Sequence, residues 1–147
     1  MARHITERGI SLIKKLEGFS NIMYLDIAGF ATIGYGHLVK PNEKDLFKNG
    51  ISESYATDLL KKDIIAAENA VIRLITVHLN NNQFDALVSF TFNLGAAALQ
   101  RSSLRRKINR EEHESIPAEF MRWIYAGGKK SSGLIHRRKL EAEVYSM

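Results

Sequence analysis

The sequence predicts an α+β fold in which a small β-containing N-terminal lobe and a larger, all-helical C-terminal lobe are joined by a long helix. Three observations lead to this prediction. Glycine, aromatic and β-branched residues are concentrated in residues 23–37, apolar residues recur at helical spacing over residues 52–75, and the chain after residue 82 has a helical pattern. The 147 residues form a single predicted domain, with lobes at about 14–50 and 76–147.

The first predicted helix runs from Glu7 to Leu16. Thr6 is a suitable N-cap, Ile10 and Ile13 recur at helical spacing, and Gly18 ends the helix. We expect this helix to pack on the C-terminal lobe.

A small antiparallel hairpin or meander is predicted for the glycine-containing stretch that follows. Asp26 and Gly29 occupy the first and fourth places of a four-residue turn, as a type I turn prefers. If Gly29 is left-handed and forms a bulge, Asp26 pairs with Phe30 and Tyr24 pairs with Thr32. This register puts Asp26 and Thr32 on one face of the hairpin.

The middle of the chain contains the longest predicted helix. Residues 40–50 are polar and are predicted to form a loop. Ser52 begins the helix, which continues to Ile75 and has a length of about 35 Å. A helix of this length in so small a protein is expected to link the two lobes.

Helices account for the rest of the prediction. They extend over residues 82–92, from Ser102 or Ser103 onward, from Pro117 to a stop at Gly127 and Gly128, and over residues 134–145. Asn82 is the candidate cap of the first of them.

The composition excludes several classes of site. Cysteine is absent, so disulfides and thiolate metal sites are excluded, and the five histidines show no metal-ligand spacing. No phosphate-binding glycine loop is present, and we expect no cofactor and no metal. The formal net charge of +5 favours anionic partners, and we expect an anionic cell envelope in preference to nucleic acid.

Basic residues of the C-terminal half are expected to form a solvated face. They are Arg101, Arg105, Arg106, Lys107, Arg110, Lys129, Lys130, Arg137, Arg138 and Lys139.

Glu17, Asp26 and Thr32 are the candidate catalytic residues. Glycoside hydrolysis needs a protonated carboxylic acid for the leaving oxygen and an ionised carboxylate near the anomeric carbon or the attacking water. Glu17 lies at the negative end of a predicted helix, which favours its protonated form, and a turn offers Asp26 backbone N–H groups that favour its ionised form. A hydroxyl beside a carboxylate is a good holder for a water nucleophile. Each residue alone is usually an ordinary surface, turn or strand residue, so the interpretation rests on their combination.

The segment E-G at residues 17–18, followed by Y-L-D-I-A-G-F-A-T-I-G-Y-G-H at residues 24–37, resembles the active-site region of the phage T4-type lysozymes, the endolysin family of glycoside hydrolases. The family pattern is E-G, then Y-x-D-x-x-G-x-x-T-I-G-x-G-H. Further matches follow in order along nearly the whole chain, at residues 82–90, 92–95, 103–105, 119–123, 126–128 and 133–141. A lone D-x-x-G-x-x-T would be a weak signal, whereas the glutamate spacing and the distal blocks together are very specific.

The resemblance implies a lysozyme-like fold and hydrolysis of the β-1,4 bond between N-acetylmuramic acid and N-acetylglucosamine in bacterial peptidoglycan, which causes lysis of the host cell. Glu17 falls on the general acid, Asp26 on the second catalytic carboxylate, and Thr32 on the hydroxyl that helps to place water. His37 falls on a histidine that holds the sheet to a neighbouring acid. Six further residues fall on positions that line the sugar cleft: Gly36, Leu38, Phe92, Asn93, Ser103 and His136.

Two positions depart from the family pattern. His78 stands where relatives often carry a proline at the start of a helix. His136 stands where an asparagine near the bound sugar is common, which puts that contact in doubt. Neither position belongs to the proposed catalytic trio.

The resemblance also implies where the protein acts. The first fifteen residues lack the apolar core and the cleavage site of a signal peptide, and no apolar run reaches the length of a membrane span. We therefore expect synthesis in the host cytoplasm, no stable membrane insertion, and action as a monomer on the cell wall in the periplasm, after a release that depends on a holin.

Two alternatives remain open. A lytic transglycosylase needs an acid and base like Glu17 but no positioned water, so Asp26 and Thr32 favour hydrolysis. A non-catalytic basic module that binds peptidoglycan or nucleic acid is permitted by the charge, although such a module has no need of acid, carboxylate and hydroxyl together.

Overall fold

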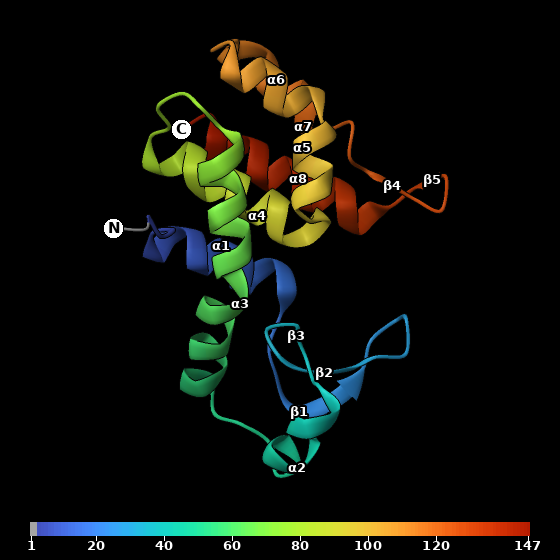
Figure 1. Cartoon of the computed structure of the whole chain (residues 1–147). Coiled ribbons are helices and arrows are strands. Elements are labelled where there is room, and N and C mark those ends of the chain that lie inside the picture. The colour runs from blue at the N-terminus through green and yellow to red at the C-terminus, as the bar shows by residue number, and fades with distance from the viewer. Residues whose placement is uncertain (1–2) are drawn as a thin grey trace. The chain divides into compact units, whose positions relative to one another are not determined.

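A computed structural model describes residues 3–147, which fold into eight α-helices, two short 3-10 helices, a three-stranded antiparallel sheet and a two-stranded ribbon (Figure 1). The chain divides into two compact units. The sheet unit is Ile10–Ile65, and the helical unit is Ala66–Met147 together with the described residues up to Gly9.

Helix α1 (Glu7–Glu17) ends at the candidate acid itself. Thr6 caps its start, because the Thr6 hydroxyl accepts the Gly9 N–H at 3.3 Å. Gly18 closes its end in the left-handed conformation, with φ of 73° and a backbone bond from its N–H to the Lys14 carbonyl at 2.9 Å. The predicted helix is confirmed to within one residue.

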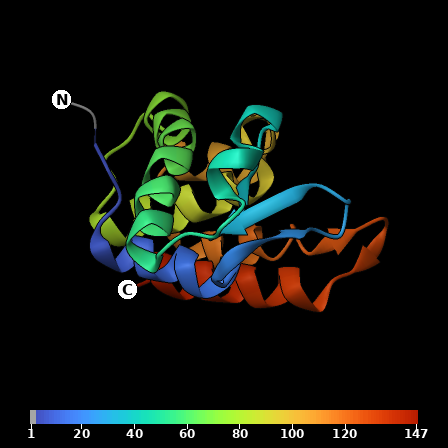
Figure 2. The ribbon, with the colours of Figure 1, turned by 90° about the horizontal axis from the view of Figure 1, so that it is seen from below.

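The sheet of the sheet unit has the order β1 (Ser20–Leu25), β2 (Ala31–Gly34), β3 (His37–Leu38). Figure 2 shows β1 and β2 side by side with the tight turn at their far end. Tyr24 is opposite Thr32, and the Asp26 N–H donates to the Phe30 carbonyl at 2.9 Å. Gly29 has a φ of 86°, so the predicted left-handed glycine and the predicted register are both confirmed.

Residues 40–50 are not the open loop that their polarity predicted. They contain the 3-10 helix η1 (Pro41–Glu43) and the short helix α2 (Lys44–Phe47). Phe47 explains the difference, because its ring is buried in a core cluster with Ile33 and Leu59. Burial of this ring stabilises a defined conformation of the segment.

Helix α3 (Glu53–Leu74) is the longest element and confirms the predicted helix to within one residue at each end. The Ser52 hydroxyl accepts the Tyr55 N–H at 3.1 Å and caps its start. Its 22 residues extend over about 33 Å. The boundary between the two units falls inside this helix, after Ile65.

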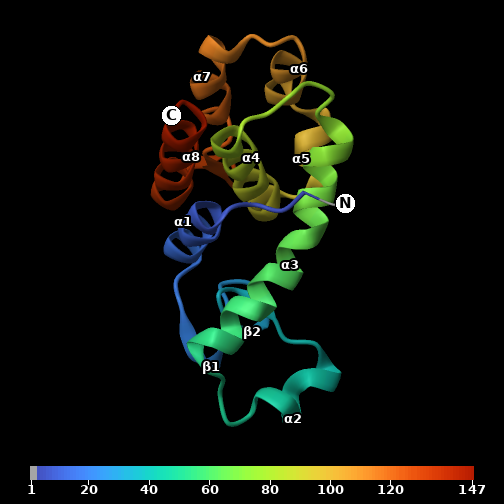
Figure 3. The same ribbon diagram turned by 90° about the vertical axis from the view of Figure 1, so that its left-hand side faces the viewer.

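The helical unit contains five further α-helices and the 3-10 helix η2 (His113–Ser115). The α-helices are α4 (Asn81–Leu94), α5 (Ala96–Arg101), α6 (Ser103–Asn109), α7 (Ile116–Phe120) and α8 (Ser132–Tyr145). Helices α4 and α8 lie side by side (Figure 3). Phe90 of α4 is fully buried and packs edge-on against Phe120 and Trp123. Phe84 is also core, and Phe92 is only partly buried.

The structure shows which residues cap α4 and α6. Asn80, and not Asn82, caps α4, because its side chain accepts the Gln83 N–H at 2.8 Å while the Gln83 side chain accepts the Asn80 N–H at 2.9 Å. This reciprocal pair is a capping box. Ser102, and not Ser103, caps α6, since its hydroxyl accepts the Arg105 N–H at 3.0 Å.

The larger lobe was predicted to be helical throughout, and one segment is not. The helix expected from Pro117 to Gly127 ends at Phe120, and a short ribbon of β4 (Tyr125–Ala126) and β5 (Lys129–Lys130) follows. Gly127 and Gly128 have φ of 58° and 80° and form its two-residue turn. Two consecutive residues with positive φ are what a type I′ hairpin turn requires.

Arg138 was predicted to belong to a solvated face, and this prediction is wrong. Arg138 and Glu141 of α8 are both 0% exposed, with 2.7 Å between Arg138 Nε and Glu141 Oε1. The Ser89 hydroxyl of α4 donates to Glu141 Oε2 at 2.6 Å. The pair is therefore part of the core that joins α4 to α8.

None of the helices within residues 3–147 combines the length and the apolar composition that crossing a membrane requires.

Candidate active site

Glu17 lies at the last position of α1, and its partly buried carboxylate lies beside Gly36. A β-carbon at Gly36 would lie 3.0 Å from Glu17 Oε2, and Gly36 has a φ of 80°. The positive φ favours glycine at this position, and an added β-carbon would push against the end of the Glu17 side chain. Gly36 was predicted to line the sugar cleft, and in the structure it lies beside the candidate acid.

We expect the Gly36→Ala variant to lose activity in a way that backbone strain does not explain. The added methyl group displaces the Glu17 carboxylate, and a small misplacement of a catalytic group can cost about tenfold to hundredfold in rate. Gly128→Ala is the matched control, because Gly128 has the same φ of 80° but nothing within 4 Å of its β-carbon position. Thermal melts and lysis rates should show similar destabilisation in both variants and a rate loss in Gly36→Ala alone. Equal rates in the two variants would contradict the contact.

Asp26 and Thr32 are held by the same residue, Phe30. The Phe30 N–H donates to Asp26 Oδ1 at 2.8 Å, and the Thr32 hydroxyl donates to the Phe30 carbonyl at 2.9 Å. The Thr32 hydroxyl proton is therefore committed, and its oxygen can only accept a further hydrogen bond. Asp26 Oδ2 has no hydrogen bond to the described part of the chain and is a second acceptor.

A polar network fixes the end of α1 to the start of α3. The Tyr35 hydroxyl donates to Glu53 Oε2 at 2.7 Å, and Lys14 Nζ lies 3.1 Å from the same oxygen. The hydrogen bonds from Tyr35, Thr57 and Lys14 lower the pKa of Glu53 to about 2. Burial, together with Glu53, raises the pKa of Tyr35 to about 12. Lys14 is one helical turn before Glu17, so this network also supports the helix end that carries the candidate acid.

This network predicts how stability depends on pH. The folded pKa of Glu53, about 2, is below its ordinary value of 4.5, so its stabilisation is complete above about pH 4.5 and is lost as the pH falls toward 2. Glu53→Gln should therefore lower the urea midpoint at pH 7, and the difference from wild type should shrink as the pH approaches 2. Asp58→Asn, a change on the same helix outside this network, should shift the midpoint little. A pH-independent loss in Glu53→Gln would show that the charge is not the cause.

His37 has the structural environment that the sequence predicted. Its Nδ1 lies 2.8 Å from Asp63 Oδ2 and its Nε2 lies 3.2 Å from Glu43 Oε1. These contacts hold β3 to α3 and η1. Its neighbour Leu38, a predicted sugar contact, is more than half exposed.

The other predicted sugar contacts belong to the helical unit. Phe92 is partly buried on α4, and His136 lies on α8. Asn93 Oδ1 accepts a hydrogen bond from Arg138 Nη2 at 2.8 Å. The buried arginine thus orients the Asn93 amide, a positioning role that the sequence did not reveal.

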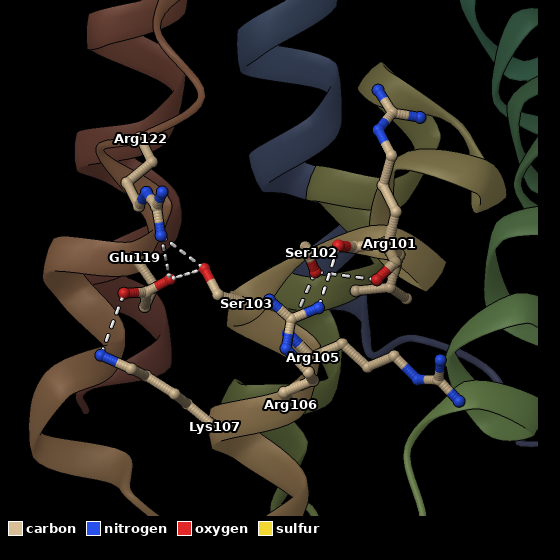
Figure 4. A network of polar contacts seen from close by, with 9 residues as sticks. Arg101, Ser102, Ser103, Arg105, Arg106, Lys107, Glu119 and Arg122 are labelled. Atoms are coloured by element: carbon tan, nitrogen blue, oxygen red, sulfur yellow. Dashed lines mark hydrogen bonds and ion pairs between the residues drawn. The ribbon is translucent and has the colours of Figure 1, made fainter.

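Ser103 is the centre of a polar cluster on α6 (Figure 4). Its hydroxyl donates to Glu119 Oε1 and accepts from Arg122 Nη1 at 2.7 Å, while Lys107 Nζ lies 3.1 Å from Glu119 Oε2. Burial alone would raise the pKa of Glu119, but the Ser103 hydroxyl and the Lys107 ammonium outweigh it and hold that pKa below its usual range. Glu119 is consequently an ionised anchor for Ser103.

Residues 14–141 match the family model described as phage lysozyme. The chain belongs to the phage lysozyme family. This family member is 37% identical to an endolysin of Acyrthosiphon pisum secondary endosymbiont phage 1, and the match covers 97% of each chain. It is 36% identical to an endolysin of Bacillus phage B103 over 97% of its own length, and it spans 54% of that relative.

Its fold is similar to that of a solved endolysin from Escherichia coli O157:H7 phage FAHEc1. The TM-score is 0.88 at 33% identity, with coverage of 99% of this chain and 94% of that one. The α+β, lysozyme-like fold predicted from the sequence is therefore confirmed.

Proposed function

We propose that this phage lysozyme hydrolyses the β-1,4 bond between N-acetylmuramic acid and N-acetylglucosamine in peptidoglycan, and so lyses the bacterial host. The observation that carries the proposal is the arrangement of Glu17, Asp26 and Thr32 in the sheet unit. A helix end and one hairpin hold an acid, a carboxylate and a hydroxyl.

The hydrogen bonds of the hairpin suit a water nucleophile. A water molecule that donates one proton to Asp26 Oδ2 and the other to the Thr32 hydroxyl oxygen has its lone pairs directed away from both. Thr32 is only 3% exposed, so a water held there is shielded from bulk solvent. During attack on the anomeric carbon, Asp26 accepts a proton from this water while Glu17 donates a proton to the leaving glycosidic oxygen.

The sugar contacts are proposed for Gly36, Leu38, Phe92, Asn93, Ser103 and His136. Gly36 leaves room beside Glu17, and the exposed Leu38 gives an apolar surface for a sugar face. In the helical unit, Asn93 and Ser103 are oriented by Arg138 and Glu119, so their polar atoms are fixed before substrate arrives.

The test is the release of soluble fragments from purified peptidoglycan. An enzyme of this class solubilises the polymer, and the optical density of outer-membrane-permeabilised bacteria falls. A non-catalytic binding module would sediment with the polymer and release nothing, which would contradict the proposal.

A further inference from the structure

A pocket of about 280 Å³ lies in the helical unit, where the end of α3, the connection to α4 and the start of α4 meet the N-terminal segment. The four residues of this unit that are proposed to contact sugar do not line it. Its apolar lining consists of Val71, Ile72, Ile75, Val77, Leu79 and Phe84. Small-molecule sites are mostly apolar and have volumes of about 300–1,000 Å³, so this pocket is of a size that suits a short ligand.

Arg3 supplies a fixed positive charge at this pocket. Its guanidinium carbon lies 4.4 Å from the centroid of the Phe84 ring, and its Nη2 donates to Asn81 Oδ1 at 3.1 Å. The stacking and the hydrogen bond orient the group. They use one of its five N–H donors, so the others remain available to a ligand.

This charge is not balanced by a local acid. Within residues 3–147, Arg3 forms no ion pair. The two buried acids that contact the N-terminal segment have other partners and do not line the pocket. Glu68 Oε1 lies 2.9 Å from His4 Nδ1, and Asp85 Oδ1 accepts the Thr6 N–H at 3.0 Å. An apolar cavity with an unbalanced guanidinium at its edge favours a ligand that combines an apolar body with an anionic group.

His78 is the second basic residue of the lining, and its side chain is exposed. It stands at the position where the family resemblance leads us to expect a proline. A proline has neither a backbone N–H nor a side-chain donor. The histidine therefore gives the pocket a hydrogen-bonding group that a proline at this position would lack.

We infer that this pocket binds a short aliphatic carboxylate, with the alkyl chain against the apolar lining and the carboxylate at Arg3 and His78. The planar fork of arginine matches a carboxylate. Five of the six apolar residues are aliphatic, and Arg3 covers the ring of the sixth, Phe84, so the lining favours an alkyl chain over an aromatic ring. The site is an addition to the proposed hydrolysis and does not depend on it.

The first test measures binding to the full chain by isothermal titration calorimetry, with octanoate as the probe. Octanoate should bind in a saturable way at one site. Octanol has the same chain without the charge, and acetate has the same charged group without the chain; each should bind at least about tenfold more weakly. Absence of octanoate binding, or equal binding of octanol, would overturn the inference. Tighter binding of octyl phosphate than of octanoate would overturn it in favour of a phosphate ligand.

The second test changes the residues that are assigned to the carboxylate. Arg3→Gln should raise the Kd for octanoate by about tenfold. Arg8→Gln is the matched control, because Arg8 is a neighbouring exposed arginine that does not line the pocket, and it should keep the wild-type Kd. His78→Pro should raise the Kd by about twofold to tenfold, the effect of one hydrogen bond. An equal Kd in Arg3→Gln and Arg8→Gln would contradict the assignment.

The third test locates the alkyl chain in the wild-type protein, so it does not depend on the folding of a variant. Methyl NMR signals of Ile72 and Val77 should shift on titration with octanoate, with the same Kd as in calorimetry. Saturable shifts confined to methyl groups outside the lining would place the ligand elsewhere and overturn the inference. Because all three tests measure binding, a loss of the proposed lytic function would not change their outcome.

Discussion

The lytic rate of Glu17→Gln should be about 10²–10⁴-fold lower than that of wild type. General acid catalysis contributes a rate factor of about that size, and glutamine has no acidic proton to transfer to the glycosidic oxygen. Its fold should remain intact. Glu17 is at the C-terminal end of α1, where the helix dipole disfavours a negative charge, so the variant should be as stable as wild type or slightly more stable. Turbidity loss of permeabilised bacteria gives the rate, and thermal melting at neutral pH gives the stability.

The matched control is Glu7→Gln, the same change at the first position of the same helix. It should leave lysis at the wild-type rate. Near-wild-type lysis by a folded Glu17→Gln protein would remove Glu17 from the catalytic machinery. A marked loss of stability would instead indicate that the residue is mainly a structural partner.

Arg138→Leu should be severely destabilising, at a cost of about 3–5 kcal/mol of the free energy of unfolding. The reason is that Glu141 would remain at 0% exposure without its 2.7 Å partner, as a buried carboxylate with one hydrogen bond from Ser89. Asn93 would also lose the donor that orients its amide. Urea denaturation measures the loss.

Two comparisons separate the buried charge from lost packing. The double variant Arg138→Leu/Glu141→Leu removes both charges and should recover much of the stability, because an apolar pair of similar volume often replaces a buried ion pair at little cost. Lys139→Leu, an exposed neighbour on α8, should change stability by less than about 0.5 kcal/mol. If the double variant is as unstable as Arg138→Leu, packing and not the orphaned carboxylate is the cause.

The parts of the structure that the sequence predicted well depend on local chemistry. The hairpin register follows from the turn between Asp26 and Gly29, and the Tyr24–Thr32 pair appears where that turn puts it. Helix α3 follows from apolar spacing that continues for 22 residues. These signals lie within a few residues of the feature that they specify.

Two of the predictions that were wrong depend on partners far away in the sequence. Arg138 was assigned to a solvated face because its neighbours are basic, whereas Ser89 and Asn93, which hold it and its partner Glu141 in the core, lie more than forty residues earlier. Phe47 is a second example. Its segment was predicted to be a loop because it is polar, whereas the Phe47 ring is buried against Ile33 and Leu59, which lie outside that segment.

The candidate site likewise contains residues that the sequence predicted and residues that it did not. The glutamate spacing and the turn predicted Glu17, Asp26 and Thr32 as candidate catalytic residues, and the structure shows that Phe30 holds Asp26 and Thr32 in the hairpin. The residues that orient the proposed sugar contacts, such as Glu119 for Ser103, were missed. Their roles depend on a contact between two helices, α6 and α7. A local sequence pattern does not predict such a contact.

The anomeric form of the first product tests the water-held mechanism most directly. If Asp26 and Thr32 hold the attacking water, it approaches from the face opposite the leaving group and inverts the anomeric carbon. Proton NMR of soluble peptidoglycan fragments, taken at early times before mutarotation, should therefore show the α anomer at the new reducing end. A predominantly β product would make Asp26 a direct nucleophile, and 1,6-anhydro ends would identify a lytic transglycosylase; either result would contradict the water-held mechanism.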